Sequence, residues 1–314
     1  MKFLCIGMMV CDYIITQIPM EIMSINGAVI RDLKITGGGD ALNVAVALSQ
    51  LGEQVAIAGR IADDLPGKYL LEYCEGNNVG VNGVVTDKNF KTATTFAIVD
   101  PTGERHFLIE NKIYETYTDK IAPQSAIAMN DIIYIGSALT FPQMDQGGIA
   151  KIFSHAKSLG KITAMDAAIH GQTYNKNLLR SLRPALETTD IFLPSLAEMI
   201  VLTNQRNPYK IADCFKEFGI KTLVIKLGKD GCYVTDFNME KIIQAVPVPH
   251  VIDTTGAGDT FVAGFLCGWA HGYNPFDCTK IGNIAASYSI QQIGSGIGLP
   301  TFTDLAKSLI SESY

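Results

Sequence analysis

The chain has 314 residues, 47% of them hydrophobic, so it can bury one large core without a disulfide framework. Its formal net charge of −6 and the absence of a basic run argue against nucleic-acid partners, and no stretch reaches the ~18 apolar residues of a membrane helix. The seven cysteines are scattered without a Cys-x-x-Cys pair, which predicts buried thiols in a reducing compartment and indicates neither zinc nor redox chemistry.

The chain begins with an apolar segment, residues 3–10, preceded by Lys2. This segment is short, lacks small residues before a cleavage point and continues into Asp12, so we interpret it as a strand and not as a signal peptide. Its first part, FLCIG at residues 3–7, is typical of a strand covered on both faces. We therefore expect a cytoplasmic protein that does not enter a membrane.

Four short β-like runs then interrupt the pattern of strands and helices, at residues 13–19, 28–35, 92–99 and 105–109. We predict that the segments 13–36 and 92–110 leave the main sheet and pair with each other as a small β-sheet lid. The remaining residues, 1–12, 37–91 and 111–314, would form the main α/β domain. A lid of this kind would exclude water from a transfer reaction, and it would also serve as a dimer contact.

From residue 132 onward, strands and helices alternate. This order predicts a doubly wound, mostly parallel sheet flanked by helices, with right-handed crossovers. The expected strands are 132–136, 162–166, 190–194 and 222–228, with helices ending at Gly160 and Gly219.

The run Gly37-Gly38-Gly39 precedes a predicted helix at residues 41–51 that carries Asn43 in its first turn. It is not a dinucleotide fingerprint, because Leu42 stands where the third glycine would be, and no Gly-Lys pair is followed by Ser or Thr as in a Walker A loop. Closely spaced glycines let a ligand reach backbone amides, and an Asn side chain both donates and accepts.

Three further elements follow predicted strands. Asp12 lies where parallel sheets bind ligands, although a carboxylate there is more often a turn or cap residue. Glu198, three residues after Ser195, is by itself usually a capping-box or surface carboxylate. The segment from Lys226 to Gly231 is either a ligand-binding glycine loop or a β-turn with solvated lysines.

The most informative stretch is residues 251–272, in which Gly256, Ala257 and Gly258 precede Asp259 and an apolar helix. The exposed N–H groups and dipole of a helix N-terminus attract anions, typically phosphate. A carboxylate beside such a phosphate site is explained best as a base acting on a nucleophile. The alternative is a simple helix-stabilising residue, worth about 0.3–1 kcal/mol.

The sequence from Asp253 to Asp259 resembles the C-terminal signature of the ribokinase-like (PfkB) carbohydrate kinases, and residues 37–52 resemble their N-terminal signature. The resemblance implies a ribokinase-like fold with a β-sheet lid. It implies that Asp259 is the catalytic base and that Gly256, Ala257 and Gly258 form an anion hole. It also implies that sugar hydroxyls are bound by Asp12, Gly38, Gly39 and Asn43.

The same resemblance suggests further roles. Ser195, which stands where the family has Asn, would contact a phosphate, and Glu198 would organise Mg²⁺ through water. The nucleotide would be bound by Lys226, Gly228, Gly231 and Asn283. Asp253, Thr255 and the loop 294–296 resemble elements that bind a monovalent cation such as K⁺. Asp166 alone remains of an Asp-Pro-Asn-x-Arg element, and we leave His170 unassigned.

We therefore expect an ATP-dependent sugar kinase that uses Mg²⁺, with Asp259 as its general base. We also expect it to form a homodimer through the lid. A nucleoside kinase with the same machinery is the alternative, and a non-catalytic sugar-binding regulator is disfavoured by the intact glycine turn and Asp259. The sequence does not identify the sugar. The predicted lid contains four cationic residues, Arg31, Lys34, Arg105 and His106. They would either contact a carboxylate or phosphate on the substrate or simply face water.

Overall fold

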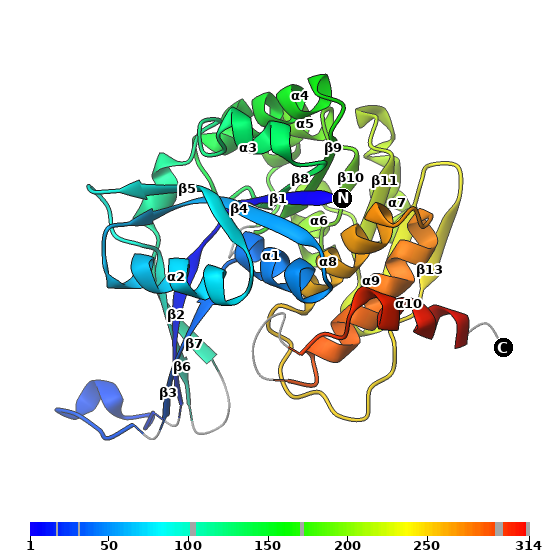
Figure 1. The fold of residues 1–314 in the computed structure, drawn as a ribbon. Helices are drawn as coiled ribbons and strands as arrows, with labels where there is room; N and C mark the ends of the chain where they lie inside the picture. The colour runs from blue at the N-terminus through cyan, green and yellow to red at the C-terminus, as the bar shows by residue number, and fades with distance from the viewer. Residues whose placement is uncertain (17, 31, 101–104, 170–172, 293–297, 312–314) are drawn as a thin grey trace.

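Two β-sheets organise the chain (Figure 1). The computed structural model describes residues 1–16, 18–30, 32–100, 105–169, 173–292 and 298–311. Within these ranges nine strands form the larger sheet. In spatial order they are β13 (Glu240–Ile243), β12 (Cys232–Thr235), β11 (Thr222–Lys226), β10 (Ile191–Phe192), β9 (Ile162–Ala167), β8 (Ile132–Ala138), β1 (Lys2–Ile6), β4 (Gln54–Ala62) and β5 (Gly80–Asp87).

The larger sheet is parallel from β11 to β5, and β12 and β13 extend it in antiparallel fashion at one edge. Residues 3–6 of β1 are fully buried, because helices cover both faces of the sheet. This explains why the strand reads as a continuous apolar run. The prediction of a mostly parallel, doubly wound sheet is confirmed, whereas the sequence pattern did not indicate the antiparallel edge.

Helices lie on both faces of the larger sheet (Figure 1). On one face, packed with Phe3 and Cys5, are α1 (Asp40–Gln50), α2 (Leu65–Gly76), α8 (Ala257–Ala270), α9 (Pro275–Ser289) and α10 (Phe302–Ser311). On the other, packed with Leu4 and Ile6, are α3 (Gln124–Met129), α4 (Ile149–Ser158), α5 (Lys176–Leu186), α6 (Leu196–Thr203) and α7 (Pro208–Asp213).

One expected helix is interrupted. The segment between Ser195 and Gly219 is not continuous, because α6 stops at Asn204, whose φ of 57° is left-handed, and α7 starts at Pro208. Asparagine tolerates this conformation, and proline begins a helix well, so both residues favour the break.

The smaller sheet contains β3 (Asp32–Gly38), β2 (Val10–Thr16), β6 (Thr94–Val99) and β7 (Arg105–Glu110), in that order. Its two halves are joined by the parallel pair β2–β6, where the rings of Tyr13 and Phe96 stack with centroids 5.1 Å apart. The sheet projects away from the helical layers (Figure 1). Its strands begin and end differently from the sequence prediction: β2 starts at Val10, residues 28–30 are not in a strand, and β3 continues to Gly38.

Among the helices of the described ranges, none has both the length and the apolar composition that a membrane crossing requires.

Candidate active site

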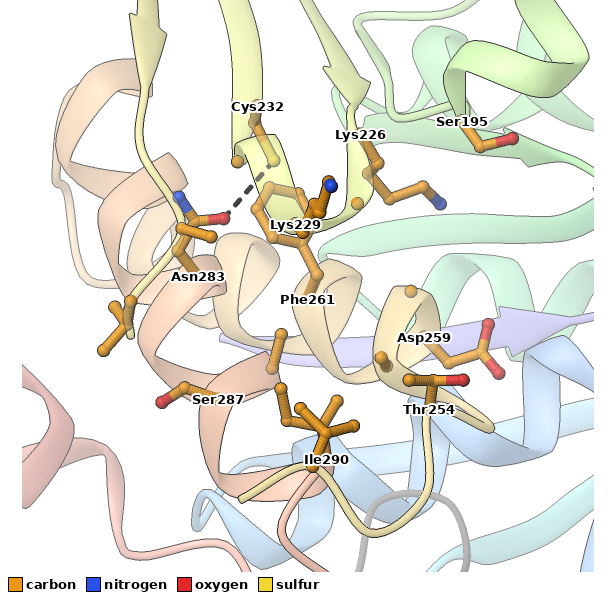
Figure 2. Close-up of a pocket in the computed structure, with 18 of the residues that line it drawn as sticks. Ser195, Lys226, Lys229, Cys232, Thr254, Asp259, Phe261, Asn283, Ser287 and Ile290 are labelled. Atoms are coloured by element: carbon orange, nitrogen blue, oxygen red, sulfur yellow. Dashed lines mark hydrogen bonds between the residues drawn. The ribbon is translucent and has the colours of Figure 1, made fainter. Parts of the chain in front are cut away.

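A cavity of about 780 Å³ opens at the carboxyl ends of β9, β10 and β11 (Figure 2). Its other walls are the turn between β11 and β12, the segment 245–251 and parts of α8 and α9. Open α/β sheets bind ligands at this edge. Polar residues that line the cavity include Asp40, Asp166, Glu198, Lys226, Asp259 and Asn283.

Helix α8 begins at one end of this cavity. Gly256 caps the helix with a φ of 70°, a left-handed conformation that glycine adopts without strain. The first-turn N–H groups of a helix have no intrahelical acceptor, so they can receive an anion. The Ala257 amide already donates to the Thr254 carbonyl at 3.2 Å, and a Cβ at Gly258 would lie 3.6 Å from Lys226 Nζ. A lysine charge thus lies beside the helix N-terminus.

Asp259 lies in the first turn of α8 and lines the cavity (Figure 2). Its Oδ2 accepts a hydrogen bond from Asn43 Nδ2 at 2.8 Å. Burial and the neighbouring carboxylate of Asp40 raise the pKa of Asp259 well above its usual range, although Asn43 and Lys226 oppose the shift. Strongly perturbed carboxylates of this kind are typical of sites of acid–base chemistry.

Lys226 and Asp166 form a buried ion pair across the ends of β11 and β9, with side chains 15% and 6% exposed. Burial alone would lower the pKa of Lys226, but Asp166 and Glu198 outweigh it and hold this pKa above its usual range. Lys226 therefore remains protonated and supplies a fixed positive charge to the cavity. Asp166, to which the sequence assigned no role, holds this charge in place.

Asp40 is a cavity residue that sequence reasoning missed. It is the first residue of α1 and accepts a hydrogen bond from Ser137 Oγ at the end of β8. The available signal was an acidic residue directly after three glycines. Such a residue is readily interpreted as a helix-stabilising carboxylate, and only the tertiary fold places it near Asp259.

Ser195 and Glu198 form a capping box at the start of α6. Ser195 N donates to Glu198 Oε2 at 2.6 Å, and Glu198 N donates to Ser195 Oγ at 3.3 Å. The capping-box role that the sequence suggested for Glu198 is therefore present in the structure. Both residues also line the cavity, and the Ser195 hydroxyl keeps its proton for another acceptor.

The far end of the cavity contains the glycine loop and Asn283. Gly228 and Gly231 have φ values of 64° and 86°, and a Cβ at Gly231 would lie 2.0 Å from the Ile243 carbonyl oxygen. Asn283 Oδ1 accepts from Cys232 Sγ at 3.3 Å (Figure 2), and its Nδ2 donates to the Gln244 carbonyl at 2.9 Å. Asn283 thus fixes the cavity wall, because both ends of its amide are engaged.

An apolar wall completes this end of the cavity. It consists mainly of residues 246–248, which lie between β13 and α8, together with side chains of α9 and its C-cap. The sequence VPVP at 246–249 has no helical or strand period, so sequence reasoning passed over it. The apolar residues concerned are Val246, Pro247, Val248, Val251, Ala286 and Ile290.

Asp12 and the glycine run meet where the two sheets join. Asp12 pairs with Thr36 and Thr95 in the ladder of the smaller sheet. A Cβ at Gly38 would lie 2.0 Å from Asp12 Oδ2, so the carboxylate contacts the Gly38 backbone directly. Gly39 has a φ of 93°, which favours glycine. Burial raises the pKa of Asp12 to about 6, against a hydrogen bond from Thr95.

Tyr114 is a second residue that the sequence analysis missed. Its side chain is 5% exposed, and its hydroxyl has no hydrogen-bond partner among the described residues. Burial raises the pKa of Tyr114 well above its usual range, and the charges of Asp40 and Asp12 add to this effect. Arg105 pairs with Val99 through its backbone, but its side chain lies outside the described part of the chain.

The expected cation-binding elements are only partly described. Asp253 is 8% exposed, and its Oδ1 accepts from Thr255 N at 2.9 Å, which is the hydrogen bond of an Asx turn. The loop 294–296 and His170 lie outside the described residues. The monovalent-cation site therefore stays a prediction.

The sequence was compared with family models and with curated proteins. Residues 2–302 match the model of the pfkB family carbohydrate kinases. An uncharacterized sugar kinase of Archaeoglobus fulgidus is 29% identical over 260 residues, which cover 82% of this chain and all of that protein. A 2-dehydro-3-deoxygluconokinase of Bacillus subtilis is 25% identical over 294 residues, with 87% and 86% of the two chains covered.

The fold is likewise similar to that of solved structures. A putative ribokinase II of E. coli, solved in complex with ATP and Mg²⁺, superposes with a TM-score of 0.81 at 18% identity, and the match covers 99% of each chain. At this identity the likeness concerns the fold.

Proposed function

The chain belongs to the pfkB family of carbohydrate kinases, and from this premise we propose that it transfers the γ-phosphoryl group of ATP to a sugar hydroxyl. The observation that carries the proposal is the position of Asp259. It lies in the first turn of α8, faces a cavity of about 780 Å³ and is hydrogen-bonded to Asn43. A base, an anion-binding helix terminus and a candidate sugar-binding residue thus meet at one point.

In the proposed reaction, Asp259 accepts the proton of a substrate hydroxyl while that oxygen attacks the γ-phosphorus. The new O–P bond forms as the bond to the β-phosphate oxygen breaks, and ADP leaves. The first-turn amides of Gly256, Ala257 and Gly258 hold the charge on the transferring group, after the Ala257 amide gives up its bond to Thr254. Lys226 adds a fixed positive charge on the same side.

Sugar binding is assigned to Asp12, Gly38, Gly39 and Asn43. The support is spatial: Asp12 contacts the Gly38 backbone, and Asn43 contacts Asp259, so the group extends from the smaller sheet to the base. Arg105 remains a candidate contact for a substrate substituent.

We assign the nucleotide to the rest of the cavity. It would be surrounded there by Ser195, Lys226, Gly228 and Gly231, and Asn283 would shape the wall that contacts the nucleotide base. Carboxylate oxygens are the protein ligands that Mg²⁺ prefers, and Glu198, which lines the cavity, would help to hold this ion through water. When bound, Mg²⁺ neutralises charge on the nucleotide phosphates. Asp253 and Thr255 are proposed to support K⁺.

We further propose that the smaller sheet, built from segments 13–36 and 92–110, is a lid and a homodimer contact in a cytoplasmic enzyme. Its faces expose large apolar side chains, which a second copy would cover. Within its strands, the most exposed of these are Leu33, Phe107, Leu108 and Ile109. Light scattering of the wild type and of Leu108→Lys tests this, since a monomeric wild type would contradict the dimer.

The function itself is tested by ATP consumption with the purified protein over a panel of hexoses, pentoses, acidic sugars, sugar phosphates and nucleosides. Turnover with a sugar supports the proposal. Turnover only with nucleosides would establish the competing nucleoside kinase. Stoichiometric sugar binding without turnover would instead indicate a regulator.

A further inference from the structure

Three potential metal ligands of different chemistry meet at the end of α8 opposite to Asp259. Cys267 lies in the last turn of α8, His271 is the C-cap residue of the same helix, and Glu53 follows α1. Glu53 Oε1 lies 2.7 Å from His271 Nε2 and accepts from Cys267 Sγ at 3.2 Å. One ligand atom of each side chain lies within 4.8 Å of the other two.

The backbone fixes all three side chains. Cys267 and His271 are four residues apart, so they project from the same face of α8. Glu53 is held by its N–H, which donates to the Leu48 carbonyl at 3.0 Å after Gly52 turns the chain with a φ of 95°. The imidazole of His271 stacks on the Phe302 ring at a centroid distance of 4.0 Å. The cluster is thus organised before any ligand binds.

The exposure of the three groups suits an ion that keeps one open position. Cys267 is fully buried and the Glu53 side chain is 9% exposed, while the His271 side chain is 45% exposed. Solvent therefore reaches the cluster from the His271 side. A thiolate, an imidazole nitrogen and a carboxylate oxygen form a set that Zn²⁺ takes up, with water as the fourth ligand.

We propose that Glu53, Cys267 and His271 form a zinc-binding site that is separate from the kinase centre. Binding removes the thiol proton of Cys267, which goes to solvent, and His271 coordinates through Nε2 with its other nitrogen protonated. The eight residues from Asp259 to Cys267 span about 12 Å along α8, so the ion does not reach the reacting groups. It joins the end of α8 to the turn after α1 and stabilises the helix pair that carries Asp259 and Asn43.

The scattered cysteines gave no zinc signal, and the structure shows why. The cluster contains a single cysteine, and its third residue, Glu53, is 214 positions away from Cys267. Without an ion, the same atoms satisfy one another, because Glu53 accepts from the thiol and pairs with the imidazole. The experiment must therefore distinguish a metal site from a hydrogen-bonded triad.

The probe is Zn²⁺ alone, added to the full-length protein after reduction and treatment with a chelator. Titration calorimetry is performed in excess Mg²⁺, which occupies sites that prefer hard oxygen ligands. We expect one equivalent of Zn²⁺ to bind, the Tm to rise and kcat to stay unchanged. Co²⁺ in place of Zn²⁺ should show a sulfur-to-metal charge-transfer band in the near ultraviolet and the visible bands of a tetrahedral ion.

Three variants, Cys267→Ala, Glu53→Gln and His271→Gln, should each weaken Zn²⁺ binding by at least about 100-fold, since losing an outer-shell partner alone costs 10–100-fold. Cys74→Ala, which removes another buried thiol in α2, is the control and should bind Zn²⁺ normally. His271→Gln changes a partly exposed side chain, so it remains informative where Cys267→Ala fails to fold. Absence of stoichiometric binding, affinity that the variants leave unchanged, or a Co²⁺ spectrum without the sulfur band would overturn the proposal.

Discussion

Asn43 Nδ2 donates to Asp259 Oδ2 at 2.8 Å, which connects two glycine-flanked helix starts that are 216 residues apart in the chain. The contact brings the polar residue that follows the first glycine run directly onto the proposed base. We therefore predict two tasks for Asn43, which orients Asp259 through this hydrogen bond and in the proposed reaction would also contact the sugar. A variant of Asn43 should consequently affect the chemistry as well as sugar affinity.

For Asp259→Asn we expect kcat to fall by roughly 10²–10⁴-fold, the usual range for a positioned general base. The amide keeps the shape of the side chain and can still accept from Asn43, but it cannot take the hydroxyl proton. The fold and both binding sites should be preserved, and ATP affinity should rise slightly as a negative charge is removed. Measurements of kcat and nucleotide affinity at matched stability check this.

Asp277→Asn is the matched control for that variant. Asp277 lies in the first turn of the neighbouring helix α9, is partly exposed and does not line the cavity, so it should tolerate the amide with unchanged kcat. If Asp259→Asn also stays within a few-fold of the wild type, Asp259 only stabilises its helix and the proposed mechanism is wrong.

Asn43→Ala should raise the KM for sugar and also shift the acidic limb of the kcat profile to higher pH. The hydrogen bond from Asn43 opposes the raised pKa of Asp259, so its loss lets this pKa rise further. The base is then deprotonated only at higher pH, while the KM for ATP stays close to the wild-type value. A pH profile that Asn43→Ala leaves unshifted, with only KM altered, would show that Asn43 does not act on Asp259.

Asp12→Asn should raise the KM for sugar and at the same time stabilise the protein above pH 6. The pKa of Asp12 is raised to about 6 in the fold, so the folded protein holds this proton more tightly than the unfolded chain. The wild type therefore loses stability as pH rises from about 4 to 6, and the asparagine variant avoids this loss. Its advantage in the free energy of unfolding should be small at pH 4 and full at pH 7.

Denaturant unfolding at both pH values, together with sugar kinetics, measures the two effects on Asp12→Asn. Asp63→Asn serves as the control, since this side chain is 58% exposed and forms an ion pair with Lys68 at the surface. An advantage that does not grow with pH would contradict the assignment of a raised pKa to Asp12. Unchanged sugar affinity would remove Asp12 from the substrate site.

The parts of this site that could be predicted from sequence are those whose signal is local. The turn at Gly256 to Gly258 and Asp259 adjoin in the chain, so a helix start with a carboxylate in its first turn could be predicted locally, and the structure has this helix start. The pairing of segments 13–36 and 92–110, which the structure shows between β2 and β6, was likewise indicated by β-like runs that no helix follows. Their strand ends differed, because the ladder of the smaller sheet extends to Val10 and Gly38 through hydrogen bonds that no local pattern encodes.

Residues whose role depends on tertiary neighbours could not be found in this way. Asp40 lies at a helix start, and its significance appears only when α1 packs beside α8 and places it near Asp259. Tyr114 resembles an ordinary aromatic core residue, and only the structure shows that its buried hydroxyl has no partner among the described residues. For Glu198, local reasoning gave a capping box, whereas the family resemblance gave Ser195 and Glu198 a ligand-binding role, and the structure shows that the capping box is formed.

The last prediction concerns the ion pair of Lys226 and Asp166, whose side chains are 15% and 6% exposed. Lys226→Met should weaken ATP binding and destabilise the fold by about 3–5 kcal/mol, because it leaves the Asp166 carboxylate buried without its partner. The loss in the free energy of unfolding should become smaller as pH falls, because Asp166 then becomes neutral. Burial already raises the pKa of Asp166. The double variant Lys226→Met, Asp166→Asn should recover most of the stability but not the ATP affinity.

The control is Lys157→Met, which breaks a lysine–aspartate pair outside the cavity and should leave the KM for ATP unchanged. If the double variant binds ATP like the wild type, Lys226 serves only to neutralise Asp166 and has no part in holding the phosphates.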